Sequence, residues 1–507
     1  MTNQQLKHMK RLSPVMFAGT GSDVGKSVLA AGFCRIFRQD GYSPAPFKAQ
    51  NMALNSFVTP DGLEIGRAQA VQAEACGIAP CADMNPILLK PLGDSISQIV
   101  LNGRAVTNVH ARDYYEDSRR DMLRAEVCNA FDRLAAAHSP VVIEGAGSVA
   151  ELNLRDADIV NISMARHAGA AVILVADIER GGVFASAYGS VMLQQPEDRR
   201  LIKGIIVNKF RGDATLFDNG RKILEDICGV PVLGVVPYFD NIHIEEEDSM
   251  ELAAKKQHAT TGSKVNVAVV KLSHISNFTD FDMLEHDARV NLYYCDDAHE
   301  LDSADIIILP GSKNTLSDLA RLRATGMAEA ITEAAYCGKT VLGICGGYQM
   351  MGATVADPHG IEGPACSAEG LSLLPVNTHL EPEKTLRQSD FIFASGRSGN
   401  MTGYEIHNGV TSPTGLKPCK PLFVKADGNS DGCVCGANCM GTYMHGVLDN
   451  PPFVDFLLAT CGKAVGSEGA ISDYKAFKDR QYDMLADFLR QHVDMRQVYR
   501  ILAEGAE

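Results

Sequence analysis

Residues 14–38 read PVMFAGTGSDVGKSVLAAGFCRIFR, and this stretch decides the fold of the first half of the chain. The apolar run at 14–18 predicts a short buried strand, and the spacing of apolar residues over 26–38 predicts a helix. Glycines separate the two segments, which is typical of a tight strand-to-helix turn. The stretch therefore predicts the first strand–loop–helix unit of an α/β fold.

The loop between strand and helix has the composition of a phosphate-binding site. A strict Walker A loop has four residues between its first glycine and the Gly-Lys pair, whereas five separate Gly19 from Gly25 here. The glycines let backbone N–H groups face one point, so that Lys26 would reach the β- and γ-phosphates of ATP and the Ser27 hydroxyl would bind Mg²⁺. The alternative is a glycine-rich turn without a ligand. The predicted ATP site comprises Gly19, Thr20, Gly21, Ser22, Asp23, Val24, Gly25, Lys26 and Ser27.

Two further residues are candidates for the same site. Glu144 ends an apolar run at 141–143 and precedes Gly-Ala-Gly, which favours a metal-binding carboxylate at the edge of a sheet. Lys48 follows a short predicted strand at 44–47 and would neutralise a phosphate or an acyl phosphate. A solvated glutamate and a surface lysine are the alternatives.

Apolar runs of Val, Ile and Leu recur along the whole chain. Near-continuous apolar runs separated by helical segments are typical of a parallel sheet covered on both faces. The polar stretch 245–263 predicts a connection between domains. We predict two α/β domains, a P-loop synthetase domain at 14–250 and a second domain at 264–453, followed by a helical tail at 454–507. The runs lie at 141–143, 171–175, 204–207 and 232–236 in the first domain and at 265–270, 304–309 and 340–344 in the second.

Cys345 lies in a G-x-C-x-G setting directly after the run 340–344. This is the pattern of a nucleophile elbow, in which a tight turn exposes the sulfur and small neighbours leave room for a substrate. The backbone N–H of Gly346 would stabilise an oxyanion, and the loop 310–312 could offer a second donor. A buried structural cysteine is the alternative.

Three cysteines, Cys433, Cys435 and Cys439, lie close together, with Cys419 nearby. Three soft ligands could bind zinc, but their spacing is not a standard one, which favours free thiols. The chain has 14 cysteines, and residues 1–13 lack the apolar segment of a secretory leader. We therefore expect a cytoplasmic protein with reduced thiols.

Composition excludes some classes of function. The formal net charge of the 507 residues is −15, which disfavours sequence-independent nucleic-acid binding. No run reaches the ~18 apolar residues of a membrane helix, so we expect no membrane association. The sequence leaves the oligomeric state open.

The first domain resembles the dethiobiotin-synthetase-like family of ATP-dependent carboxylate-activating domains, through its long phosphate loop, the strand-ending Glu144 and the pair Asn208-Lys209. The resemblance implies that Asn208 reads the adenine. Longer stretches resemble the cobyric acid synthase family, and with the cysteine domain the similarity covers most of 14–453. These stretches are QNMALNS at 50–56, NLRDADIVN at 153–161, ADIERGGVFAS at 176–186, NKFRGD at 208–213 and EDS at 247–249.

The segment GTYMHG at 441–446 resembles the histidine segment of class I glutamine amidotransferases of the cobyric acid synthase branch. The resemblance makes His445 the candidate base for Cys345. The common class I pattern has a proline and a glutamate after the histidine, but Gly446 and Val447 follow here. Glu405 is a possible orienting carboxylate, or the Cys-His pair suffices alone.

The family resemblance implies a glutamine-fed ligase that uses ATP and Mg²⁺. Cys345 would release ammonia from glutamine, and the first domain would phosphorylate a carboxylate, whose acyl phosphate ammonia then attacks. Ammonia would pass directly between the sites, because free ammonia is mostly protonated at neutral pH. The implied substrate is a corrinoid, adenosylcobyrinic acid a,c-diamide, amidated at its b, d, e and g carboxylates.

Three rival functions remain at this point. Cobyrinic acid a,c-diamide synthases share the domain order, but the segments 50–56 and 153–161 speak against them. Cytidine triphosphate synthases have a different phosphate loop and histidine segment. A partition-type ATPase acting as a scaffold would need no nucleophile at the elbow, so Cys345 and His445 argue against it.

Overall fold

The computed structural model describes residues 11–91, 96–114, 117–245, 258–415, 418–463 and 466–505. It divides into two compact units, which are described separately. The first unit contains residues up to 52, 64–244 and 478–507, and the second contains 53–63 and 245–477. The division therefore separates the segment 53–63 from the rest of the range 14–250, and splits the tail 454–507 between the units. Most of the predicted connection 245–263, with the EDS segment, lies outside the described residues.

The first unit is built on a six-stranded sheet whose hydrogen-bonded strands are all parallel. Every apolar run predicted in this half forms one of its strands, and β1 lies between β10 and β9. Because the carboxyl ends of parallel strands meet at one edge, the residues after β1, β9 and β2 converge there. The order is β12 (Val232–Pro237), β11 (Ile202–Phe210), β10 (Ala171–Asp177), β1 (Val15–Gly19), β9 (Val141–Glu144) and β2 (Ala45–Phe47).

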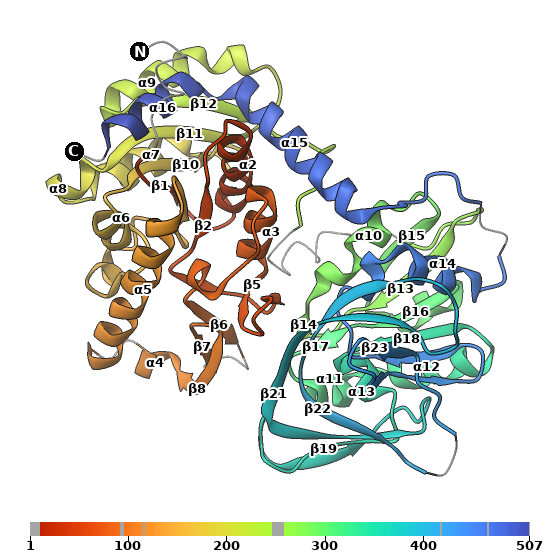
Figure 1. Ribbon diagram of the computed structural model, residues 1–507. Helices are drawn as coiled ribbons and strands as arrows, with labels where there is room; N and C mark the ends of the chain where they lie inside the picture. The colour runs from red at the N-terminus through yellow and green to blue at the C-terminus, as the bar shows by residue number, and fades with distance from the viewer. Residues whose placement is uncertain are drawn as a thin grey trace. The chain divides into compact units, whose positions relative to one another are not determined.

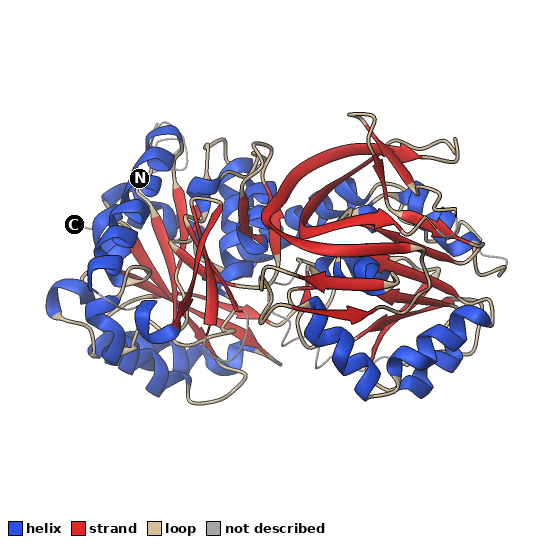
Figure 2. Cartoon of the chain, turned by 90° about the horizontal axis from the view of Figure 1, so that it is seen from below, coloured by secondary structure: helices blue, strands red, loops and turns tan. Residues whose placement is uncertain are grey.

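Helices cover both faces of this sheet, as Figures 1 and 2 show. Successive residues of a strand point to opposite faces, so Met16 packs in one core and Phe17 in the other. The Met16 core lies under α5 (Asp117–Ala137), α6 (Ile162–Ala168), α7 (Val183–Met192) and α9 (Asp218–Cys228). The Phe17 core lies under α2 (Lys26–Gln39), α3 (Arg67–Cys76), α16 (Met495–Glu504) and residues 482–489 of α15 (Tyr474–His492).

The C-terminal part of the chain is thus an integral layer of the first unit. Leu485 and Leu489 pack against Gly32 of α2, where a Cβ would collide with Leu489. The Arg35 guanidinium bonds Asp483 at 2.7 Å and Asp479 at 3.2 Å. A smaller four-stranded sheet completes the unit and runs in the order β3 (Gln50–Met52), β6 (Ile87–Pro91), β7 (Ile96–Leu101) and β8 (Arg104–His110).

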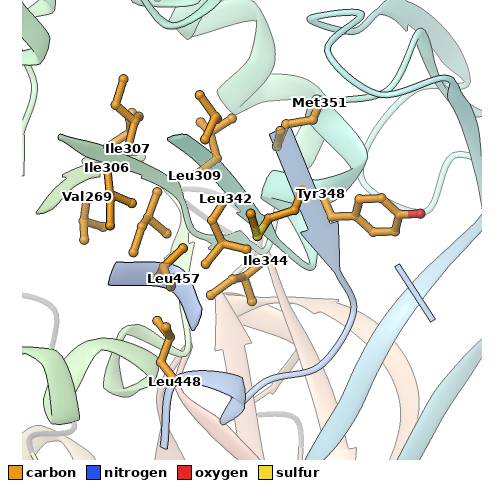
Figure 3. Close-up of a cluster of buried hydrophobic side chains, with 14 of the residues drawn as sticks. Val269, Ile306, Ile307, Leu309, Leu342, Ile344, Tyr348, Met351, Leu448 and Leu457 are labelled. Carbon is orange, nitrogen blue, oxygen red and sulfur yellow. The ribbon is translucent and has the colours of Figure 1, made fainter. Parts of the chain in front are cut away.

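The second unit contains another six-stranded sheet. Its strands pair in parallel except at the β25 edge, which is antiparallel. Figure 3 shows Val269, Ile306 and Leu342 of three neighbouring strands in one buried cluster with Leu448 and Leu457. The order is β15 (Val290–Cys295), β13 (Val265–Val270), β16 (Ile306–Leu309), β18 (Thr340–Ile344), β26 (Cys439–Thr442) and β25 (Cys433–Cys435). These two parallel-sheet units confirm the predicted α/β fold class.

The second unit also contains a mixed sheet that the sequence analysis did not anticipate. Its centre is the long antiparallel pair β21 (Val376–Phe393) and β22 (Met401–Pro413). β22 carries Glu405 and Tyr404. Among the described residues, no helix is both long enough and apolar enough to cross a lipid bilayer.

Candidate active sites

The phosphate loop of the first unit connects β1 to α2. Its last glycine, Gly25, has φ 94°, and Asp23 has φ 56°. Glycine adopts a φ of 94° without strain, and a Cβ at Gly25 would collide with the side-chain amide of Asn208. The backbone therefore requires glycine at this position, next to the first residue of the helix.

Lys26 lies across the loop that it follows. Its Nζ donates to the carbonyl oxygens of Gly21 at 2.9 Å and Gly147 at 3.1 Å. A Cβ at Gly19 would lie 2.8 Å from Nζ, so the glycine makes room for the ammonium group. The contacts place a cation between the loop after β1 and the loop after β9, where the sequence predicts phosphates.

Glu144 is the centre of a buried polar cluster at the same sheet edge. Its Oε1 accepts from Ser27 Oγ at 2.8 Å and from Lys48 Nζ at 2.9 Å, and its Oε2 accepts from Gln72 Nε2 at 2.6 Å. Burial raises the pKa of this carboxyl, but the charge of Lys48 and the three hydrogen bonds outweigh burial and lower it. Glu144 is therefore a carboxylate at neutral pH.

The donor set fits Mg²⁺. Ser27 and Glu144 present hard oxygen atoms to one point, and Mg²⁺ in such sites binds one or two protein oxygens together with phosphates and water. Gln72 Oε1, on the neighbouring helix α3, is buried and has no hydrogen-bond partner among the residues that the structure describes. The sequence analysis missed Gln72, because a glutamine inside a helix gives no signal of its own.

Asn208 lies against the phosphate loop. It is the last buried residue of β11, and its Nδ2 donates to the Val24 carbonyl oxygen at 2.9 Å. The next residue, Lys209, has φ 60°, and its Nζ lies 3.5 Å from Asp177 Oδ2. The structure thus brings the predicted nucleotide residues Lys26, Ser27, Lys48, Glu144 and Asn208 to the carboxyl edge of one sheet.

In the second unit, Cys345 lies at a sharp turn between β18 and α13 (Gly346–Met350). Its φ of 52° and ψ of −107° are unusual for a residue with a side chain. A Cβ at Gly346 would lie 2.7 Å from the Ser312 backbone nitrogen. The glycine after Cys345 therefore allows the loop after β16 to approach, as the predicted oxyanion site requires.

Asp318 holds this loop in place. Ser312 Oγ donates to Asp318 Oδ2 at 2.6 Å, and His274 Nδ1 lies 3.0 Å from Asp318 Oδ1. The bond to Asp318 raises the pKa of His274, although burial partly opposes it. The loop beside Gly346 is thus positioned by a buried carboxylate.

His445 follows β26, the strand next to β18, so the topology brings it to Cys345. Its Nδ1 lies 2.7 Å from Asp280 Oδ2, and the Gly446 N–H donates to Asp280 Oδ1 at 2.8 Å. Burial lowers the pKa of His445, but the charge of Asp280 and the contact with Cys345 outweigh burial and raise it to about 10. The three side chains form a Cys-His-Asp arrangement.

Asp280 corrects the suggestion that Glu405 orients the histidine. Glu405 Oε1 instead accepts from Lys425 Nζ at 3.1 Å, and Arg387 bonds Oε2. Burial raises the pKa of Glu405, but hydrogen bonds from His407 and Arg387 and the charge of Lys425 lower it to about 2. Asp280 was missed because it precedes His445 by 165 residues and no local pattern marks it.

The cysteines near His445 lie on the antiparallel strands β25 and β26. All 14 cysteines of the chain carry free thiols, and Cys419 Sγ lies 2.8 Å from Cys433 Sγ. Burial raises the pKa of Cys439 to about 11. Within the described ranges, no group of three or more His, Cys, Asp or Glu side chains is placed to hold a metal ion.

Comparison with known proteins follows the same division of the chain. The family model of the CobQ/CobB/MinD/ParA nucleotide-binding domain matches residues 15–252. The family model of the CobB/CobQ-like glutamine amidotransferase domain matches residues 266–453. The phosphate loop falls in the first match, and Cys345, His445 and Asp280 fall in the second.

Relatives similar to this chain match it from end to end. A cobyric acid synthase of Bacteroides fragilis is 60% identical over 496 residues, covering 98% of this chain and 99% of the relative. Cobyric acid synthases of Phocaeicola vulgatus and Syntrophobacter fumaroxidans are 56% and 49% identical, each covering 97% of this chain and 99% of the relative. The chain belongs to the cobyric acid synthase family.

Proposed function

We propose that this chain is a glutamine- and ATP-dependent ligase that amidates the b, d, e and g carboxylates of adenosylcobyrinic acid a,c-diamide, giving adenosylcobyric acid in cobalamin biosynthesis. The observation that carries the proposal is the full-length similarity to cobyric acid synthases. The two sites support it, because a glutamine-fed ligase needs both a nucleophile for an amide and a site for ATP.

Cys345 is the proposed nucleophile for glutamine. Its thiolate attacks the side-chain carbonyl carbon, and the Gly346 N–H, with the adjoining loop at Ser312, stabilises the oxyanion. The His445 imidazolium, held by Asp280, donates its proton to the leaving nitrogen, so that ammonia departs and a thioester remains on Cys345. Water then attacks the thioester and releases glutamate.

The first unit is proposed to activate the carboxylate. A substrate carboxylate oxygen attacks the γ-phosphorus of ATP, ADP leaves, and ammonia then displaces phosphate from the acyl phosphate to form the amide. Lys26 and Lys48 neutralise charge on the phosphoryl group during transfer. Ser27 and Glu144 would hold Mg²⁺, which adds charge neutralisation when bound. Asn208 is proposed to contact the adenine.

Mass spectrometry of corrinoids tests this function. The chain is incubated with ATP, Mg²⁺ and glutamine, together with either cobyrinic acid or its adenosylated a,c-diamide. Stepwise amidation of the a,c-diamide at four positions supports the proposal. Amidation of cobyrinic acid at only the a and c positions would identify a cobyrinic acid a,c-diamide synthase instead. Absence of glutamine hydrolysis would favour a partition-type ATPase that acts as a scaffold.

Replacing Asp280 with asparagine should lower glutamine hydrolysis by about a hundredfold, at the low end of the contribution of acid–base catalysis. Against the lowering effect of burial, the charge of Asp280 and the contact with Cys345 raise the pKa of His445 to about 10, so the imidazolium persists until pH rises through that value. Without the carboxylate charge, the pKa of His445 falls, and the alkaline limb of the rate profile moves to lower pH. Ammonia release measured from pH 6 to pH 10 checks the shift.

A matched control for this variant is Asp287→Asn, which changes another buried aspartate of the same unit, paired with Arg289 instead of a histidine. Its alkaline limb should coincide with that of the unchanged protein. An unshifted profile for Asp280→Asn would show that Asp280 does not act on His445.

Glu144→Gln should slow amidation with either nitrogen source by about a hundredfold and raise the Mg²⁺ concentration required for half-maximal rate. The variant removes the charge that faces Lys48 in a buried pair, which also destabilises the first unit by about 3–5 kcal/mol. Glutamine hydrolysis should persist. Exposed Glu197→Gln, in the same unit, serves as the control, and an unchanged Mg²⁺ requirement in Glu144→Gln would argue against the metal site.

A further inference from the structure

The segment Ala53–Leu63 belongs to the second unit, although its flanking strands belong to the first. β3 (Gln50–Met52) precedes it and β5 (Glu64–Gly66) follows it, and the whole segment lies within the match to the nucleotide-binding family. Two of its polar residues are almost completely buried, because Asn55 and Ser56 are each 1% exposed. A polar pair buried this completely requires hydrogen-bond partners, and these identify what the segment does.

Asn55 and Ser56 bond reciprocally to the residues just before Asp280. Asn55 Oδ1 accepts from the Phe278 N–H at 3.1 Å, and the Ser56 N–H donates to Asn277 Oδ1 at 3.0 Å. Asn277, with φ 54°, immediately precedes the single 3-10 turn Phe278–Phe281 that carries Asp280. The two bonds therefore fix the start of the turn whose third residue faces His445.

The same segment also contacts Tyr404, a second residue that packs against His445. The Tyr404 hydroxyl donates to the Ser56 carbonyl oxygen at 3.4 Å, and Phe57 packs on the Tyr404 ring with centroids 5.0 Å apart. Tyr404 exchanges two backbone hydrogen bonds with His445, at 3.1 and 2.9 Å. Its ring stacks on the imidazole with centroids 5.4 Å apart. Asn55–Phe57 thus support both members of the Asp280–His445 pair.

We propose that the segment Ala53–Leu63 is a positioning element for glutamine hydrolysis, and that Asn55 is its principal positioning residue. The inference rests on the proposed glutaminase function of the second unit. Asn55 acts through the turn that carries Asp280, whose first N–H its side chain accepts. Glutamine hydrolysis then depends on a stretch of chain that begins and ends in strands of the nucleotide-binding half, so the two halves cannot be separated at residue 250 without loss of activity.

The positioning role predicts a defined kinetic signature for Asn55→Ala. A displacement of Asp280 weakens its contact with His445, and misplacement of catalytic groups by about 1 Å costs on the order of a hundredfold. We expect kcat for glutamine hydrolysis to fall ten- to a hundredfold by the same argument, with KM for glutamine nearly unchanged. The alkaline limb of the pH–rate profile should move to lower pH, because a displaced Asp280 raises the pKa of His445 less. Among the described residues, Cys345 and Tyr404 also face His445. Amidation with ammonium chloride should continue.

Asn277→Gly is the second variant, which covers the case in which Asn55→Ala does not fold. Glycine keeps the φ of 54° without strain and removes only the side-chain acceptor of the Ser56 N–H. It should reproduce the lower kcat and the shifted profile to a smaller extent. Asn102→Gly, at φ 47° in a turn of the first unit, is the matched control and should behave as the unchanged protein.

Gln388→Ala distinguishes the positioning of Asp280 from a general loosening of the segment Ala53–Leu63. Gln388 Nε2 donates to the Val58 carbonyl oxygen at 2.8 Å, so it holds the segment without bonding the turn that carries Asp280. Its profile should keep the original alkaline limb. The proposal is overturned if Asn55→Ala and Asn277→Gly keep the original kcat, or lose it without a shift of the limb. Failure of the unchanged protein to hydrolyse glutamine would instead overturn the proposed function.

Discussion

Cys345→Ala should abolish glutamine-dependent amidation and leave ammonium-dependent amidation intact. Loss of a catalytic nucleophile lowers kcat by on the order of 10⁴-fold or more, because no thioester can form. The first unit keeps Lys26, Ser27, Lys48 and Glu144, so external ammonia can still attack the acyl phosphate. The measurement is amide formation with glutamine and then with ammonium chloride, at alkaline pH where free ammonia is plentiful. It tests whether glutamine hydrolysis and amide formation use separate sites.

The exposed Cys337 provides a control for this experiment, because it is a free thiol of the same unit that lies at the end of α12 (Met327–Tyr336) and not at the turn after β18. Cys337→Ala should support amidation with both nitrogen sources. If folded Cys345→Ala lost both reactions, the two halves would not divide the chemistry as proposed. If it kept glutamine-dependent amidation, Cys345 would not be the nucleophile.

The sequence predicted those parts of the site that local pattern determines. A phosphate loop and a nucleophile elbow each combine a buried strand, small residues and a turn, and all of these features lie within a few neighbouring positions. The convergence of Lys48 and Glu144 on the loop followed as well, because residues after neighbouring parallel strands share one edge of the sheet. The topology that follows from alternating strands and helices was therefore enough to predict that Lys48 and Glu144 lie near the phosphate loop.

The remaining features depend on contacts between distant parts of the chain. Asp280 reaches His445 through a short 3-10 turn, and Asn55 reaches that turn from the first half of the chain, so neither leaves a periodic signal. The long strands β21 and β22 are half polar, which hides them from a search for apolar runs. The C-terminal helix α16 is amphipathic, but the face that it covers depends on tertiary packing with α2 and β12.

The second large expected effect on amidation is that of a substitution in the nucleotide site. Lys26→Ala should lower amidation about a thousandfold with either nitrogen source, because phosphoryl transfer loses the cation that neutralises developing charge. Lys26 Nζ donates to the carbonyl oxygens of Gly21 and Gly147, which fixes the ammonium group between the loops after β1 and β9. Glutamine hydrolysis, which uses Cys345 and His445, should continue. Phosphate release and ammonia release measured on the same samples separate the two reactions.

Lys222→Ala, on the exposed side of α9, controls for the loss of a lysine from the same unit.

The Cys345→Ala and Lys26→Ala variants should retain different reactions: the first keeps amidation with ammonium, and the second keeps hydrolysis of glutamine. A mixture of the two variants should then form amides from glutamine only through ammonia released into solution, because neither chain holds both intact sites. Amidation by the mixture should therefore disappear when a glutamate dehydrogenase trap removes free ammonia, whereas amidation by the unchanged chain should resist the trap. Equal sensitivity of both would show that ammonia reaches the acyl phosphate through bulk solvent.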